Sequence, residues 1–250
     1  MLEINKIYCG DCLELMPLID DKSINMILCD LPYGTTACKW DTVIPFEPLW
    51  DNYKRIIKDN GAIVLTASQP FTSKLVISNI KMFKYEWIWE KDGGSNFATV
   101  KYMPMKEHEN ILIFSNGTPN YFPIFQERVG SRKDKETSSF QTSSKGGVYG
   151  DIEGIGKFEV SLLRCPRSIQ RFTRERGVHP TQKPVALFEY LIKTYTNENE
   201  LVLDNCIGSG TTAIACWNTK RNFIGIEQEQ EYVDIANKRL EQTFKQEVLL

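Results

Sequence analysis

Residues 201–213 read LVLDNCIGSGTTA, and this stretch decides the fold class of the chain. A short apolar run ends at Asp204, and a glycine turn follows before residues that suit a helix. Gly208 and Gly210 let the backbone approach a ligand closely, and the first amide groups of the helix have no intrahelical partner. A strand, a glycine turn and a helix in this order predict a nucleotide-binding βα unit.

The same stretch indicates the class of cofactor. Gly208, Gly210 and Ala213 satisfy the spacing of a dinucleotide-binding fingerprint. Glu227 closes the next apolar run, where its carboxylate can accept hydrogen bonds from ribose hydroxyls. A lysine-bearing phosphate loop is disfavoured, because threonines stand at 211 and 212 where that loop needs Lys-Ser or Lys-Thr. We therefore expect an adenosine-containing cofactor, and the spacing alone leaves its identity open.

Outward from this unit, short apolar runs alternate with amphipathic segments along the chain. This alternation predicts an α/β fold with a doubly wound, mostly parallel sheet of seven strands. The expected strands are 4–9, 24–29, 62–67, 85–90, 110–115, 201–204 and 222–226. Apolar stripes at helical spacing in 46–57, in 184–195 and from Tyr232 to Phe244 predict helices that cover the sheet.

Four of the expected strands end at an acidic residue: Asp11, Asp30, Asp204 and Glu227. In an open α/β sheet, ligands bind outside the carboxyl ends of the parallel strands. A single aspartate after a strand is explained by a turn or a helix cap. Four such acids favour a shared ligand-binding rim.

Residues 30–41, DLPYGTTACKWD, indicate what this rim could hold. Asp30, Leu31, Pro32 and Tyr33 present an acid, a main-chain carbonyl and an aromatic ring directly after an apolar run. The two oxygens can accept hydrogen bonds from an amino group while the Tyr33 ring stacks on the planar ring that carries it. The tetrapeptide thus predicts a site for a planar, amino-bearing ring.

Residues 116–178 interrupt the alternation of strands and helices. From Arg128 to Arg176 there are eleven lysines and arginines against six acids, although the whole chain carries a net charge of −2. A solvated charged loop would explain the charge alone, but the interleaved aromatic residues favour a small folded lobe with a basic face. We therefore divide the chain into a main domain, 1–115 with 179–250, and an insert, 116–178.

Composition excludes several other classes. A net charge of −2 argues against a nonspecific DNA coat. Seven cysteines without a secretory signal indicate reduced thiols, and Cys9-x-x-Cys12 has no second C-x-x-C partner, so we expect no metal site. No apolar run reaches the roughly 18–20 residues of a membrane span, and the start MLEINKIYCG does not resemble a signal peptide. We expect a cytoplasmic protein without a membrane partner.

Together these motifs resemble the S-adenosylmethionine-dependent DNA amino-methyltransferases, in the permuted order called the β group. DLPY at 30–33 looks like their D/N/S-P-P-Y/F/W catalytic motif, and 204–212 looks like their D-P-F-x-G-S-G-T-T cofactor loop. HPTQKP at 179–184 matches the box that precedes this loop without a change, and GDCLE at 10–14 is similar to their G-D-x-L-E segment. The matches cover both ends of the chain in the group's order.

The resemblance implies a role for each matching residue. Asp30, Leu31, Pro32 and Tyr33 would be catalytic, with the Asp30 carboxylate and the Leu31 carbonyl holding the amino group of a flipped base. The cofactor would be S-adenosylmethionine, which leaves as S-adenosylhomocysteine. Its binding residues would be Asp11, Cys12, Thr181, Lys183, Asp204, Cys206, Gly208, Ser209, Gly210, Thr211 and Glu227. The insert would recognise the DNA target, with mostly phosphate contacts from Arg164, Arg167, Arg171, Arg174 and Arg176.

Two positions depart from the family pattern. Leu31 replaces a proline, which removes a fixed φ but keeps the carbonyl acceptor. Asn205 and Cys206 replace Pro-Phe in the cofactor loop, which predicts weaker contact with the methionine portion of the cofactor.

We therefore predict a site-specific methyltransferase that modifies the N6 amino group of adenine in double-stranded DNA. Adenine is preferred because an acid opens the catalytic motif, a pattern commoner among adenine-modifying members of the family. The alternatives are a cytosine-N4 methyltransferase, a methyltransferase for protein glutamine or RNA, a DNA-binding regulator without turnover, and a nicotinamide-dependent oxidoreductase. A homodimer and a cognate restriction endonuclease are partners known in the family, and no sequence feature here decides either.

Overall fold

The computed structural model describes residues 2–36, 38, 41–127, 137–138, 158–159, 163–175 and 182–247. The chain divides into two compact units, Met1–Phe122 with Ser168–Leu250, and Pro123–Arg167. The Arg176 and Thr181 predictions lie outside the described residues. None of the described helices is both long and apolar enough to cross a membrane.

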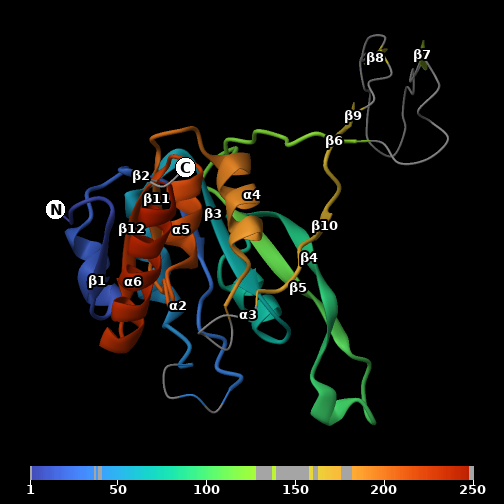
Figure 1. Ribbon diagram of the computed structural model, residues 1–250, viewed down its shortest axis with the longest axis horizontal. Helices are drawn as coiled ribbons and strands as arrows, with labels where there is room; N and C mark the ends of the chain where they lie inside the picture. The colour runs from blue at the N-terminus through green and yellow to red at the C-terminus, as the bar shows by residue number, and fades with distance from the viewer. Residues whose placement is uncertain are drawn as a thin grey trace. The chain divides into compact units, whose positions relative to one another are not determined.

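The first unit is built on one sheet, which has eight strands in the described part of the chain (Figure 1). Their spatial order is β1-β12-β11-β2-β3-β5-β4-β10. The bounds are β1 Lys6–Cys9, β2 Ile24–Cys29, β3 Ile57–Ala67, β4 Phe83–Ser95, β5 Lys106–Phe114, β10 Ile169–Arg171, β11 Leu201–Asp204 and β12 Asn222–Glu227. Strand β5 runs antiparallel to both of its neighbours, and the other pairings are parallel. Seven of these eight strands therefore point their carboxyl ends to the same edge.

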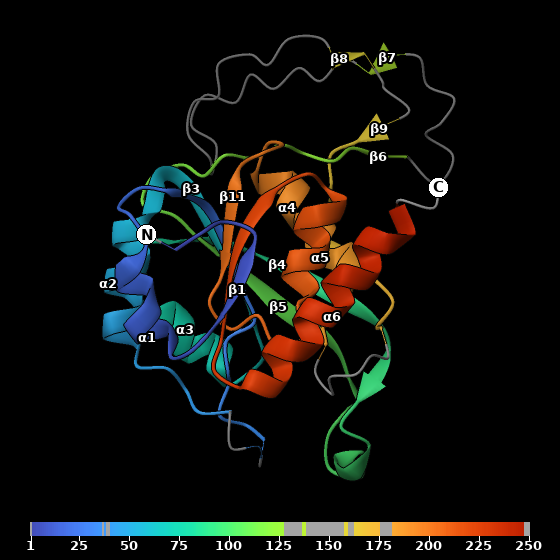
Figure 2. The same cartoon turned by 60° about the vertical axis from the view of Figure 1, so that its left-hand side comes forward.

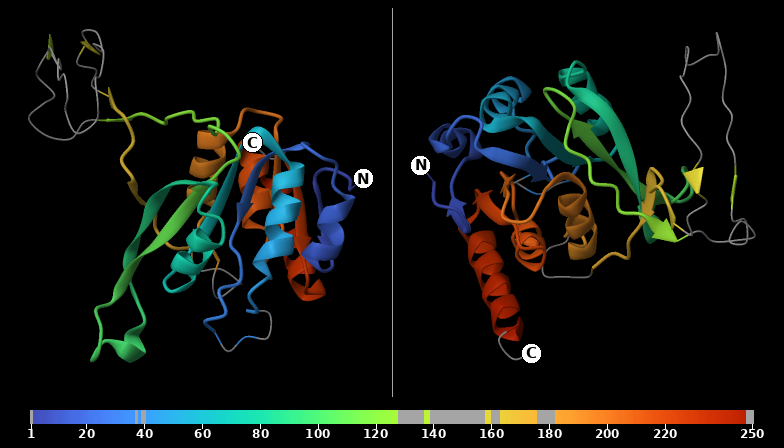
Figure 3. Two further views of the ribbon diagram at one scale, coloured as in Figure 1. Left: turned by 180° about the vertical axis from the view of Figure 1, so that it is seen from behind. Right: turned by 90° about the horizontal axis from the view of Figure 1, so that it is seen from above.

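Helices cover both faces of this sheet (Figure 2; Figure 3). One face carries α1 Cys12–Leu15, η1 Met16–Leu18, α2 Phe46–Ile56 and α3 Phe71–Ser78, and the other carries α4 Val185–Tyr195, α5 Thr211–Asn218 and α6 Gln230–Glu247. A further short helix, η2 Phe97–Thr99, lies between β4 and β5.

The central strands pack against both layers because successive side chains of a strand point to opposite faces. On β2, Ile27 and Cys29 belong to the core under α2 and α3, whereas Met26 and Leu28 belong to the core under α4 and α5. All six residues of β2 are buried. This double burial explains the continuous apolar run that the sequence shows there.

The predicted α/β fold with a mostly parallel, doubly wound sheet is confirmed, and each of the seven expected strands is present. The expected number of seven is corrected to eight within the described residues, because β10 adds an edge strand. Only Gln170 of β10 is buried, so this strand lacks the apolar run by which the others were recognised. The expected helices at 46–57 and 184–195 are α2 and α4, with Pro184 at the N-cap rather than at the first helical position.

The described residues of the second unit form two short antiparallel pairs. Strand β6, Gln126–Glu127, pairs with β9, Leu163–Arg164, and β7, Thr137–Ser138, pairs with β8, Phe158–Glu159. The compact unit is thus narrower than the insert expected at 116–178, because the residues of β10 belong to the main sheet.

Candidate active site

The four acids of the expected rim lie at one edge of the sheet. Strands β1, β12, β11 and β2 are consecutive parallel neighbours, and Asp11, Glu227, Asp204 and Asp30 stand at their carboxyl ends. Asp11 also caps α1 by accepting a hydrogen bond from the Leu13 amide at 2.7 Å. The edge therefore brings the DLPY tetrapeptide and the glycine turn to adjacent strands, β2 and β11.

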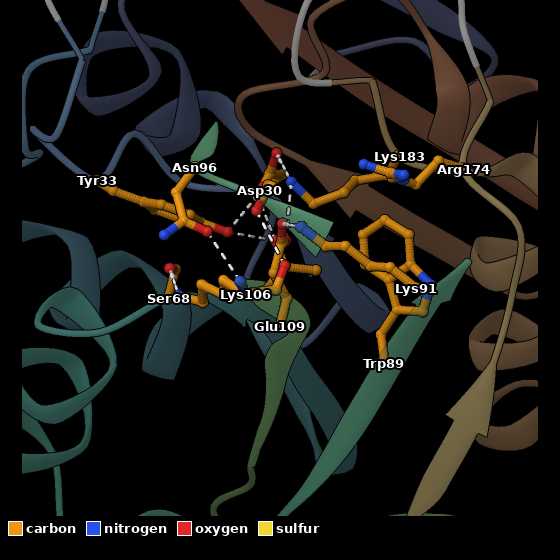
Figure 4. Close-up of polar contacts among 12 residues, drawn as sticks. Asp30, Tyr33, Ser68, Trp89, Lys91, Asn96, Lys106, Glu109, Arg174 and Lys183 are labelled. Carbon is orange, nitrogen blue, oxygen red and sulfur yellow. Dashed lines mark hydrogen bonds and ion pairs between the residues drawn. The ribbon is translucent and has the colours of Figure 1, made fainter. Parts of the chain in front are cut away.

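The Asp30 carboxylate is held from three directions (Figure 4). The Tyr33 hydroxyl donates to its Oδ1 at 2.7 Å, and the Thr66 hydroxyl also donates to Oδ1. The Lys183 ammonium donates to Oδ2 at 2.5 Å. Both oxygens thus have fixed partners, and the carboxylate is oriented before any ligand arrives.

Lys183 connects Asp30 to a second buried ion pair. Its ammonium lies 3.4 Å from Oε2 of Glu109, and Glu109 in turn pairs with Lys91 at 2.5 Å. Burial opposes the charged form of Lys183, but the carboxylates of Asp30 and Glu109 outweigh it and raise the Lys183 pKa. Burial likewise opposes ionisation of Glu109, but the two lysines lower its pKa. Two cations and two carboxylates therefore form a charged network of zero net charge under the catalytic motif.

Sheet register explains how this network is assembled. Trp89 of β4 pairs with Glu109 of β5, and Lys91 follows two residues later on the same face. The Lys91 ammonium lies 5.1 Å from the centre of the Trp89 ring, a cation–π contact that helps to hold it toward Glu109.

The Tyr33 ring lies near a second aromatic ring and a cation. It stacks on Phe71 of α3 with ring centres 5.1 Å apart and an interplanar angle of 24°, and the Lys183 ammonium lies 5.8 Å from its centre. Burial and the negative charge of Asp30 raise the pKa of Tyr33, so its hydroxyl keeps its proton and donates. The Leu31 side chain is buried in the core and anchors the tetrapeptide, beside a half-buried Pro32.

Asp41 closes the loop that follows the tetrapeptide. Its carboxylate accepts hydrogen bonds from the amides of Gly34, Thr35 and Thr36 at 2.6–2.8 Å. Burial opposes the charged form of Asp41, but these bonds prevail and lower its pKa. The chain therefore turns back tightly after Tyr33, because one side chain satisfies three amide groups.

The glycine turn leaves room where a ligand could approach. Gly208 and Gly210 have φ of 51° and 85°, the left-handed region that favours glycine. A Cβ at Gly210 would lie 2.8 Å from Cβ of Ala236, so this glycine permits close packing of α6, whereas nothing lies within 4 Å of a Cβ at Gly208. Glu227 accepts the Gly208 amide at 2.9 Å, which fixes its carboxylate beside this open position.

Asp204 is a buried carboxylate inside the same turn. It accepts hydrogen bonds from the Thr212 hydroxyl and, at 3.1 Å, from the Cys206 amide. Burial raises the pKa of Asp204 to about 7, although these hydrogen bonds favour its charged form. In the structure, the Asp204 side chain thus holds the glycine turn in place through these two hydrogen bonds.

Ser209 and Thr211, two further predicted cofactor residues, also bond to protein groups. Ser209 receives hydrogen bonds from Arg239 on its carbonyl and, at 2.9 Å, on its hydroxyl. The Thr211 hydroxyl donates to the Lys183 carbonyl at 3.4 Å, which ties the start of α5 to the residue that pairs with Asp30. Lys183 was expected among the cofactor-binding residues; its contacts in the structure are with Asp30 and Glu109, and its contact with a cofactor stays a prediction.

Three thiols gather beside the turn. Cys12 and Cys29 each share a hydrogen bond with Cys206, and the Tyr53 hydroxyl donates to Asn205 at 2.5 Å. Burial raises the pKa of Cys29 to about 12, and the Cys12 and Cys206 pKa values are raised too, in part by the hydrogen bonds between the thiols. The thiols are therefore neutral packing groups, and among the described residues no group of three or more His, Cys, Asp or Glu side chains is arranged so that it could hold a metal ion.

The arginines predicted to bind DNA are spread over both units. Arg164 and Arg167 belong to the second unit, and Arg171 lies exposed on β10. Arg174 is paired with Asp92, which accepts its Nε at 2.9 Å and its amide at 3.1 Å.

Sequence reasoning missed Thr66, Glu109, Lys91 and Asp41. The rim argument would have found Thr66, because it is a polar residue near the end of the apolar run of β3, a parallel neighbour of β2. Glu109 precedes an apolar run instead of following one, and only the reversed direction of β5 brings it to the same edge. No local pattern signalled this reversal.

Comparison with known proteins agrees with this geometry. The family model described as DNA methylase, of the N6/N4 type, matches residues 24–238. The chain belongs to this family. The expectation drawn from the four motifs is thereby confirmed.

Relatives that align with most of this chain are methyltransferases. The type II methyltransferase M2.DpnII of Streptococcus pneumoniae is 51% identical over 93% of this chain and 88% of its own. The DNA adenine methyltransferase YhdJ of Escherichia coli is 27% identical over 96% of this chain and 83% of its own. The crystal structure of the M1.HpyAVI–SAM complex has a TM-score of 0.60, at 24% identity, and covers 94% of this chain and 99% of its own, so it shares the fold.

Proposed function

We propose that this protein is a DNA methyltransferase that transfers a methyl group from S-adenosylmethionine to the N6 amino group of an adenine in double-stranded DNA. The observation that carries the proposal is the Asp30 carboxylate, fixed by Tyr33, Thr66 and Lys183 on a strand that neighbours the glycine turn. Membership of the DNA methylase family supports the reaction class and argues against a nicotinamide-dependent oxidoreductase.

The residues present fit S-adenosylmethionine. The open space at Gly208 admits a ligand against the backbone, and Glu227 presents a carboxylate to the ribose side of this space. Asp11 on the neighbouring strand β1 suits the adenine end, and the Cys206 side of the turn suits the methionine end. When bound, S-adenosylmethionine supplies an electrophilic methyl group on a positively charged sulfur.

On the base side, Asp30 and Leu31 hold the amino group. An adenine inside a duplex is out of reach, so it must leave the stack to meet the tetrapeptide. The Asp30 carboxylate and the Leu31 carbonyl accept the two amino hydrogens, which directs the nitrogen lone pair away from both acceptors. Tyr33 provides a ring for the base to stack on, an interaction worth about 1–3 kcal/mol per base. Positioning supplies much of the rate, because the reacting atoms must be in near contact and aligned.

Adenine is proposed over cytosine for two reasons. An acid opens the catalytic motif, and one relative over nearly the full chain is named as an adenine methyltransferase. The cytosine-N4 alternative uses the same acceptors, because cytosine also carries an exocyclic amino group.

We assign target recognition to the insert at 116–178, and phosphate contacts to its basic residues. Its excess of positive charge supports this assignment, because phosphate contacts from lysine and arginine provide most sequence-independent affinity. The candidates for these contacts are Arg164, Arg167, Arg171, Arg174 and Arg176, of which Arg174 is also paired with Asp92. The cytoplasmic location rests on the DNA substrate and stays a prediction, as do a homodimer and a cognate endonuclease.

Modification-sensitive sequencing of DNA from a host that expresses this chain tests the proposal. The expected result is N6-methyladenine at one short recurring sequence, absent when Asp30→Ala is expressed to the same level. Methyl groups on cytosine N4 would refute the adenine assignment alone. Unmodified DNA, combined with no transfer of labelled methyl to DNA by the purified protein, would refute the proposed function.

A further inference from the structure

The hairpin of β4 and β5 extends well beyond the sheet that carries it. Asn110 of β5 pairs with Ala67, the last residue of β3, and with Ile88 of β4. From Ile88, β4 continues to Ser95, which pairs with Lys106. At about 3.3 Å per residue this arm reaches roughly 20 Å past the end of β3.

This arm, residues 91–106, stands on the edge that carries the candidate active site. Strand β4 is antiparallel to β5, and β5 is antiparallel to β3, so β4 runs in the same direction as β2 and β3. Its carboxyl end therefore points to the edge of Asp30. Figures 1 and 2 both show the arm and the chain after β2 projecting from the same side of the sheet.

The tip of the arm exposes a group of large apolar side chains. Tyr102 is 86% exposed and Phe97 is 70% exposed. Val100, Met103 and Met105 beside them are also exposed. Single exposed apolar residues are ordinary, but five of them within residues 97–105, at the end of a projecting hairpin, indicate a binding surface.

The tip has a defined shape. Asn96, with φ of 62°, donates to the Thr99 hydroxyl at 2.9 Å and accepts the Lys106 amide at 2.8 Å, so one side chain ties the two strands together. A Cβ on Gly94 would lie 2.6 Å from Cβ of Met105, which shows how closely the strands cross there. The exposed apolar side chains thus stand on a turn that hydrogen bonds and close packing of the two strands hold in a defined shape.

The charge of the arm selects its partner. The arm carries three lysines, at 91, 101 and 106, against one acid, Asp92, which is paired with Arg174, in a chain of net charge −2. Lys91 pairs with Glu109 and Lys106 donates to Ser68, so Lys101, beside the exposed Tyr102, is the lysine at the tip. A lysine next to exposed aromatic rings suits a polyanion with stackable bases better than a second copy of an acidic chain. The edge itself supplies the second argument, because on the proposed function a flipped base would enter the site at the edge from which this arm also projects.

We infer that the arm docks on the DNA duplex next to the target base, with Phe97 and Tyr102 packing against bases and Lys101 against the phosphate backbone. This inference rests on the proposed function and adds a contact surface outside the insert. By filling the space that a flipped base vacates, the two aromatic rings favour the open duplex.

The test uses the double variant Phe97→Ala/Tyr102→Ala and a fluorescent duplex that contains the mapped methylation sequence. One lost stacking contact of about 1 kcal/mol corresponds to about a five-fold weaker Kd, so the double variant is expected to bind the duplex at least five-fold more weakly. Methylation of the same sequence as a single strand is expected to fall less than that of the duplex, because no base needs to be flipped. Binding of S-adenosylmethionine is expected to be unchanged.

The matched control is Ile80→Ala. Ile80 is 61% exposed but lies just before the first residue of β4, at the opposite edge of the sheet, so its loss is expected to change neither binding nor methylation. Sedimentation velocity of the variants tests the alternative, in which the arm binds a second copy of this chain. A wild-type dimer that becomes monomeric in the double variant, with duplex affinity per protomer intact, would make the arm a subunit interface and overturn the inference.

Two further outcomes separate this inference from the function on which it rests. If the wild-type protein methylates DNA and the double variant binds the duplex as tightly as wild type, the docking of the arm on DNA is refuted and the proposed function is not. If the wild-type protein methylates no DNA, the proposed function fails. The same binding comparison on a random-sequence duplex then still shows whether the arm contacts DNA.

Discussion

Replacing Lys183 with methionine would remove one charge from the network beneath the catalytic motif. The Lys183 side chain is 7% exposed, and its ammonium lies 2.5 Å from Asp30 and 3.4 Å from Glu109. Methionine has a similar length and no branch, so Lys183→Met changes the charge with little change in volume. The variant leaves Asp30 and Glu109 close together without the cation between them.

The expected cost follows from burial. Breaking a buried ion pair by removing one partner destabilises a protein by about 3–5 kcal/mol, because the remaining charge is uncompensated. Asp30 is 24% exposed, and Glu109 keeps Lys91 at 2.5 Å, so part of the charge stays compensated. We therefore expect the lower end, about 3 kcal/mol, which is a large share of the roughly 5–15 kcal/mol that stabilises a typical domain.

Guanidinium denaturation measures this change, with Lys22→Met as the control. Lys22 pairs with Asp59 at 2.7 Å, but the two side chains are 47% and 89% exposed. An exposed pair contributes about 0–1 kcal/mol, so the control should stay within about 1 kcal/mol of wild type.

A Lys183→Met protein as stable as the Lys22→Met protein would refute this reasoning, because similar distances would then have similar worth regardless of burial. The double variant Lys183→Met/Glu109→Gln sharpens the test. It restores zero net charge to the network, so its loss of stability should be smaller than the sum of the two single losses. Additive losses would contradict a shared network.

Three further outcomes are expected. Thr66→Val removes a hydroxyl donor from the Asp30 carboxylate and should lower kcat/KM for methyl transfer about ten-fold or more, since hydrogen bonds to charged groups are worth about 1.5–3 kcal/mol. The control Thr66→Ser keeps the hydroxyl and should retain most of the activity. Equal losses of activity in both variants would show that the shape of the side chain matters and the hydrogen bond does not. Tyr33→Phe keeps the stacked ring and should be far more active than Tyr33→Ala in the same assay, and equal activities would argue against stacking. Burial raises the Asp204 pKa to about 7, so Asp204 stabilises the fold at low pH and loses this contribution as the pH rises from about 4 to about 7. Asp204→Asn should therefore gain stability relative to wild type between pH 4 and 7, as followed by thermal unfolding across that range, and a constant difference would contradict the raised pKa.

Local sequence patterns predicted the sheet and the two main parts of the site, the DLPY tetrapeptide and the glycine turn. Buried strands such as β2 read as apolar runs, and the acids that end them sit at the predicted edge. Strand β10 escaped prediction because an edge strand needs only one buried side chain, Gln170. The contacts around Asp30 were not predicted for another reason. Thr66 and Lys183, which bond to Asp30, and Glu109, which pairs with Lys183, come from three distant segments, and no local sequence pattern indicates which side chain each of them contacts.

The order of the strands in the sheet also constrains when the sheet can fold during synthesis of the chain. β1 and β2 are the first strands to be made, yet β12 and β11 separate them in the finished sheet. A nascent chain that ends before residue 201 holds the DLPY tetrapeptide but lacks the two strands that fill this gap. The sheet can therefore close only after β11 and β12 have been made, and a chain that ends before residue 201 is expected to transfer no methyl group.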